Sequence, residues 1–169
     1  MPLTIYQASI PVFVRTLANL KSILAKGAAH AQARKIDEAA FLQARLFPDM
    51  FPFTSQVHIA TDMARGGAAR LSGGEPPKYD DTEKTFAELI ARVERSIAYV
   101  QSLPESQFDG AETRTITRPL RGEPHAFTGL GYLQQFILPN LYFHATIAYA
   151  LLRHNGVEIG KADFIGALD

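Results

Sequence analysis

Two polar side chains lie on the apolar faces of two different predicted helices. On a helical wheel His144 falls in the middle of the apolar face of residues 128–154, and Gln56 falls on the apolar side of residues 51–71. A buried polar group without a hydrogen-bond partner costs about 1–3 kcal/mol, so we expect each side chain to have one. His144 is either a metal ligand or general base, or a core histidine bonded to a neighbour. Gln56 either pairs with His144 or caps an irregular entry into its helix.

A second pair of residues has the spacing of metal ligands. His58 and Asp62 are four residues apart, and imidazole and carboxylate on one helix face can hold a cation. The wheel turns both toward solvent, so we interpret them as a plain surface pair. The chain has no cysteine, which excludes thiolate chemistry, and it has no His-Glu-x-x-His motif, P-loop or Gly-x-Gly-x-x-Gly fingerprint.

Four long segments with helical periodicity must position these residues. They span about residues 4–26, 51–71, 82–103 and 128–154. Asp37 is a good cap for a further short helix through about residue 46, and Asp81 is the expected cap of the third long helix. The long stretch between the first two long helices predicts a crossing connection.

The segment before the last helix breaks the helical pattern. Residues 113–118 favour a strand, Arg121-Gly122 a turn, and residues 125–127 a returning strand. We therefore predict an all-α fold, a four-helix bundle with a small β-hairpin before the last helix, in a single domain over residues 1–169.

Composition excludes several classes of partner. The 169 residues carry 17 basic and 17 acidic side chains, and the basic ones are scattered. We therefore expect no nucleic-acid or membrane partner. The N-terminal segment lacks the features of a signal peptide, and we expect a cytoplasmic protein.

Three segments carry a family resemblance: YQASIPVFVRTLANL, LQARLFPDMFPFTSQV and FHATIAYALLRHNGVEIGKADFIG. Over nearly its whole length the chain resembles a bacterial family of unknown function within the DinB/YfiT-like superfamily of four-helix bundles. That resemblance implies a divalent metal held by one histidine of the second helix and a His-x-x-x-His pair of the fourth. His144 matches the first member of that pair, the second falls at Ala148, and the histidine available on the second helix is His58.

The resemblance also implies where the pocket lies. Equivalent helices meet around the metal in the superfamily, so we expect His144 and Gln56 to approach each other in a small, partly solvated cavity that Tyr6 also lines. Pro139, five residues before His144, distorts the helix there, and Gly67 adds room on the facing helix.

Three functions follow as alternatives. The preferred one is small-molecule binding or a stress-related role at the pocket of His144, Gln56 and Tyr6, without a tight metal site or other cofactor. The second is a transferase or hydrolase that depends on a divalent metal such as zinc or nickel, held by His58 and His144 and completed by Asp62, Gln56 or water. The third is a structural dimerisation module. Superfamily members are commonly dimers, so we expect a homodimer.

Overall fold

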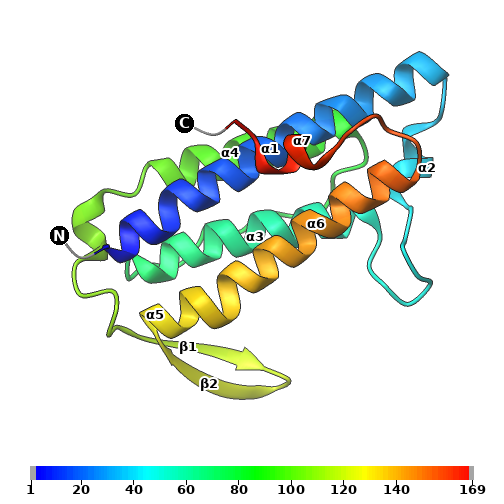
Figure 1. Ribbon diagram of the computed structural model, residues 1–169. Coiled ribbons are helices and arrows are strands. Elements are labelled where there is room, and N and C mark those ends of the chain that lie inside the picture. Colours follow the sequence, from blue (N-terminus) through cyan, green and yellow to red (C-terminus); the bar gives the residue numbers. More distant parts are fainter. Residues whose placement is uncertain (1–2, 168–169) are drawn as a thin grey trace.

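The computed structural model describes residues 3–167, which are mainly helical (Figure 1). The long helices are α1 (Ile5–Arg34), α3 (Phe53–Leu71), α4 (Phe86–Gln101) and α6 (Leu138–His154). The shorter helical pieces are α2 (Glu38–Leu42), a 3-10 turn (Glu105–Phe108), α5 (Gly129–Gly131), a π-helical turn (Tyr132–Ile137) and α7 (Lys161–Ile165). The predicted hairpin is confirmed: β1 (Thr115–Leu120) pairs antiparallel with β2 (Glu123–Thr128).

The long helices run in two directions (Figure 1). Phe86 at the start of α4 packs on Phe53 at the start of α3, with ring centroids 5.8 Å apart, so α3 and α4 are parallel neighbours. The chain must return along the bundle between them, and residues 72–85, which we call the strap, make that crossing. The prediction of a crossing between the first two long helices is therefore wrong, since α2 and short loops join antiparallel α1 and α3 at one end.

Two predicted helix ends are corrected by the packing around them. The sequence predicts that the first long helix ends at about residue 26, but α1 continues past Gly27. Gly27 instead lets the side chains of two other helices pack closely on α1, because a Cβ there would lie 3.0 Å from Phe86 and 3.1 Å from Leu152. The helix α4 begins later than predicted because Thr85, not Asp81, caps it by accepting the Glu88 amide at 3.1 Å. Asp81 therefore belongs to the strap.

The last predicted helix is divided near Pro139. A π-helical turn over Tyr132–Ile137 precedes α6, in whose first turn Pro139 lies. A proline ring clashes with the carbonyl four residues earlier in a regular α-helix, and a wider turn upstream relieves that clash. The predicted distortion before His144 is therefore present.

The core lies between the four long helices. Its members are buried aliphatic and aromatic side chains, among them Phe13, Leu17, Phe53, Leu89, Ile137 and Leu151. Gly67 permits the close contact of α3 with this core, because a Cβ would meet Ile137 at 2.9 Å and Phe13 at 3.2 Å. None of the helices within residues 3–167 combines the length and the apolar character needed to cross a membrane.

Gly129, between the hairpin and the π-helical turn, allows a test of this packing. A Cβ at Gly129 would collide with the backbone carbonyl oxygen of Ala111, whereas at Gly160 it would meet no atom within 4 Å. Overpacking against backbone is relieved only by moving the chain, so we expect Gly129→Ala to lower the free energy of unfolding by about 2–3 kcal/mol. Gly160→Ala, the matched control, should change it little in urea denaturation. Equal stability of the two variants would contradict this placement of the hairpin against Ala111.

Candidate functional site

The structure brings His144 and Gln56 together. His144 Nδ1 lies 2.7 Å from Gln56 Oε1, across the seam between α6 and α3. Gln56 is 1% exposed and His144 is 8% exposed. The expected contact between these two inward side chains is therefore present, and each provides the partner that burial demands of the other.

The hydrogen bonds around Gln56 fix the proton on His144. Gln56 Nε2 donates to the carbonyl of Phe51 at 3.0 Å, so the amide oxygen faces the imidazole. That oxygen only accepts, and His144 Nδ1–H must therefore donate to it. In the neutral ring, Nε2 is then left with an unprotonated lone pair. The chain Phe51 carbonyl, Gln56 amide and His144 ring, which we call the amide relay, orients that lone pair.

Burial keeps the His144 ring neutral. Desolvation lowers the pKa of His144 below its usual value of 6.5. The Phe143 ring meets the imidazole edge-on, with centroids 5.1 Å apart, and is itself 56% exposed. The Phe51 side chain at the other end of the amide relay is 59% exposed. A neutral hydrogen-bond acceptor thus lies beside exposed aromatic surface.

Tyr6 is not part of this arrangement. Its ring packs edge-on against Phe108 at 5.3 Å, and it lines a hollow with residues of the 3-10 turn at the end of the bundle where α1 begins (Figure 1). Gln56 lies at the opposite end, where α3 begins. The expectation that Tyr6 shares a cavity with His144 and Gln56 is wrong. Tyr6 and Gln56 both lie near the start of their helices, and because α1 and α3 are antiparallel these starts are at opposite ends of the bundle.

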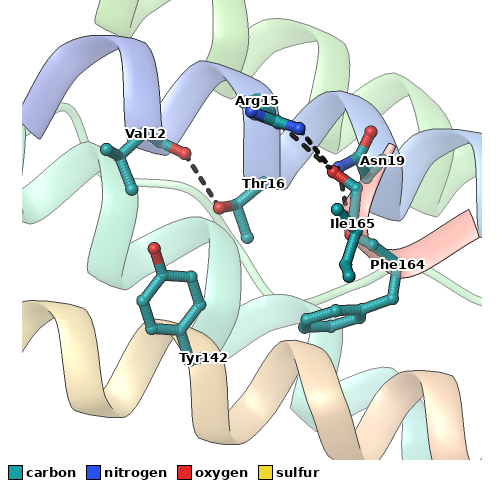
Figure 2. A pocket seen from close by; sticks show the side chains of 7 residues that line it. All are labelled: Val12, Arg15, Thr16, Asn19, Tyr142, Phe164 and Ile165. Carbon is teal, nitrogen blue, oxygen red and sulfur yellow. Dashed lines mark hydrogen bonds between the residues drawn. The ribbon is translucent and has the colours of Figure 1, made fainter. Parts of the chain in front are cut away.

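The hollow in Figure 2 lies elsewhere, between α1, α6 and α7. It encloses about 320 Å³ and is lined by Val12, Arg15, Thr16, Asn19, Tyr142, Phe164 and Ile165. Tyr142 rises from α6 with its hydroxyl directed toward α1. Arg15 and Asn19 donate from α1 to the carbonyls of Phe164, Ile165 and Ala167 at 2.8–3.2 Å, and these bonds hold the C-terminal segment on the bundle.

His58 lies on the opposite side of α3 from Gln56, and it is buried. The helical wheel predicts that His58 and Asp62 face solvent, but the strap covers this face and leaves His58 only 6% exposed. His58 Nε2 is 2.9 Å from Glu83 Oε2, and His58 Nδ1 is 3.5 Å from Asp81 Oδ1. The predicted surface pair is therefore wrong: the nearest carboxylates to His58 come from the strap.

Asp62 pairs with arginines. Its Oδ1 accepts from Arg65 Nη2 at 2.5 Å and from Arg92 Nη2 at 3.0 Å. Arg92 is fully buried, and it also donates to Thr61 on α3 at 2.9 Å and to Glu83 at 3.3 Å. We call His58, Asp62, Arg65, Asp81, Glu83 and Arg92 the strap cluster. Burial and the neighbouring Arg92 charge lower the pKa of His58.

An aromatic ring of the strap completes this surface. Tyr79 lies under the Arg65 guanidinium at 3.7 Å from the ring centroid and near that of Arg95 at 4.7 Å, where a cation is attracted to the ring face. The site residues predicted from the sequence do not include Tyr79, Glu83, Arg65 or Arg92. The sequence signal for this cluster is the acidic run YDDTE, whose carboxylates pair with arginines of the neighbouring helix α4.

Comparison with known proteins agrees with the predicted resemblance. The family model described as "Domain of unknown function (DUF1993)" matches residues 5–165. The chain belongs to this family. A crystal structure of a DinB family member from Shewanella denitrificans is 41% identical and superimposes with a TM-score of 0.91, covering 96% of this chain and 92% of that one. No curated protein matches the DUF1993 chain.

The three-histidine metal site that the resemblance implies does not fit this member of the DUF1993 family. Position 148 is an alanine, whose methyl group cannot bind a metal. The Nδ1 of His144 is engaged by Gln56, and His58 faces the strap on the other side of α3. The structure therefore does not bring His58 and His144 together around one ion. The Asp62 carboxylate forms ion pairs with Arg65 and Arg92 instead.

A double-mutant cycle tests the amide relay. His144→Leu alone leaves the buried Gln56 oxygen without a donor, so we expect a loss of about 1–3 kcal/mol in the free energy of unfolding. Gln56→Leu alone should cost a similar amount by isolating Nδ1–H. The double variant replaces both polar groups. Its loss of unfolding free energy, measured in urea, should therefore be smaller than the sum of the two single losses by about 1 kcal/mol or more. Strict additivity would show that the hydrogen bond contributes nothing.

Proposed function

We propose that this protein binds a small molecule that has an apolar ring and a hydrogen-bond donor, and that His144 Nε2 accepts from that donor. The observation that carries the proposal is the amide relay, which keeps the proton on Nδ1 and so fixes the Nε2 lone pair in one direction, while burial keeps the ring neutral. A pre-oriented acceptor costs little conformational entropy when a ligand binds. The exposed ring of Phe143, which meets the imidazole edge-on, offers apolar surface next to it.

The hollow of Figure 2 supports ligand binding less well. Its volume of about 320 Å³ falls at the lower end of ligand pockets. However, Arg15 and Asn19 already donate to carbonyls of the C-terminal segment. That hollow therefore has space with few uncommitted donors, whereas His144 has an uncommitted acceptor.

Phenol and anisole test the proposal, since they share a ring and differ in the donor. We expect phenol to shift the imidazole nitrogen resonances of His144 saturably, and anisole to bind at least tenfold more weakly, about the value of one hydrogen bond. His144→Phe should lose phenol binding, whereas His154→Phe, which alters an exposed histidine, should keep it. Binding should also weaken as the pH falls through the pKa of His144, which burial places below 6.5, because the protonated ring has no acceptor. Equal binding of phenol and anisole would refute the role of His144.

We also propose that the protein is a homodimer. Tyr142 and Phe143 are 42% and 56% exposed on neighbouring positions of α6, where a second copy would cover them and close one side of the ligand site beside His144. Sedimentation at micromolar concentration should give a dimer for the wild type and a monomer for Phe143→Asp. Phe47→Asp, a change at another exposed ring, should remain dimeric. A monomeric wild type would end this proposal.

A further inference from the structure

We propose that His58, Glu83 and Asp81 form a binding site for a divalent transition metal such as Zn²⁺ or Ni²⁺, where the strap crosses α3. The three side chains offer ligand atoms that all lie within 4.8 Å of one another. This site is independent of His144, because it lies on the other side of α3 and shares no residue with the amide relay.

The decisive atom is His58 Nε2. It is buried and makes no hydrogen bond, although Glu83 Oε2 is only 2.9 Å away. The oxygen is thus close to the nitrogen but off the direction in which an N–H would donate. Two ligands of one tetrahedral zinc ion, each about 2.0–2.1 Å from it, are themselves separated by roughly 3.3 Å. A small shift of the Glu83 carboxylate away from His58 would therefore give this nitrogen and oxygen the spacing of two ligands of a common ion.

Glu83 is held by arginines while its Oε2 faces His58. Arg92 Nη1 donates to Oε1 at 3.3 Å and to Oε2 at 3.4 Å, and Arg95 Nη2 lies 3.6 Å from Oε1. Hydrogen bonds to the outer oxygen of a carboxylate orient the inner one for a metal. The side chain of Glu83 is 6% exposed, so this orientation is protected from water.

Asp81 supplies the third ligand and the path of entry. Its Oδ1 lies 3.5 Å from His58 Nδ1 and 2.9 Å from Arg92 Nη2, so Asp81 must turn toward the Nε2 side of the ring to share an ion with Glu83. Its side chain is 58% exposed and therefore has room to turn. An ion can therefore reach the site from solvent and keep a water molecule in a fourth position, as zinc does at sites with three protein ligands.

The surrounding charges set the metal preference. The carboxylates of Asp62, Asp81 and Glu83 are offset by Arg65, Arg92 and Arg95, so a divalent ion adds positive charge that no further side chain of the cluster balances. We therefore expect weaker binding than at zinc sites built from thiolates. The imidazole donor should favour Zn²⁺ and Ni²⁺ over Mg²⁺ and Ca²⁺, which prefer oxygen ligands alone.

Calorimetric titration of the full-length chain without a histidine tag tests the site. We expect one Zn²⁺ per chain, and at least a tenfold loss of affinity in His58→Gln and in Glu83→Gln. His154→Gln removes an exposed histidine and should leave the affinity unchanged. Circular dichroism of each variant shows whether it is folded, and the His58 imidazole resonances of the wild type should shift with Zn²⁺ but not with Mg²⁺.

Several outcomes would overturn the proposal. If the wild type took up no Zn²⁺, or if His58→Gln bound it as tightly as the wild type, the strap cluster would be an ion-pair network and not a metal site. Loss of binding in His154→Gln would show an adventitious surface site. If a strap variant fails to fold, the imidazole resonances of the wild type decide, because a bound metal must shift those of His58.

Discussion

The buried guanidinium of Arg92 is the interaction on which the arrangement of the helices depends. Helices α3 and α4 are parallel, so the chain must cross back between them, and the strap has to be held against their seam. Arg92 does this by contacting Thr61 on α3, the carbonyl of Asp80 and the carboxylate of Glu83. A fully buried arginine requires such partners, because an uncompensated charge in the interior costs several kcal/mol, about 3–5 when one partner of a buried pair is removed. The strap and the arginine therefore depend on each other.

Much of the fold could be predicted from periodicity, because most residues of a bundle helix face either the core or solvent. The hairpin could be predicted because its residues interrupt the helical periodicity. The contact of Gln56 with His144 could be predicted because each is a polar residue on the apolar face of its helix. The burial of His58 and Arg92 could not, since a helical wheel describes one helix alone. Whether a polar face meets water depends on where the strap runs, and that follows from the parallel course of α3 and α4. The predicted end of the first long helix falls too early, just before Gly27, for a related reason. In the sequence alone, a glycine that permits close packing cannot be told from a glycine that ends a helix.

Two polar arrangements thus share the first turns of α3. Gln56 and His58 are two residues apart and point to opposite sides, one toward α6 and the other toward the strap. The side facing α6 is where the superfamily's metal would lie, and here an amide takes the role of orienting the histidine. The side facing the strap carries charged groups of both signs. A displacement of the start of α3 would alter both arrangements together, since one short stretch of backbone carries both.

The π-helical turn before α6 sets the rotational phase of everything that follows it. A π turn contains one residue more than the α-helical turn it replaces, and each residue in an α-helix advances the side chain by about 100°. If all the residues between Tyr132 and Ile137 were kept but formed a regular α-helix, the rest of α6 would be rotated relative to the hairpin by about that angle. His144 would then leave the seam with α3, and an apolar neighbour would face Gln56. The single extra residue upstream of Pro139 thus determines which side chain of α6 meets the amide.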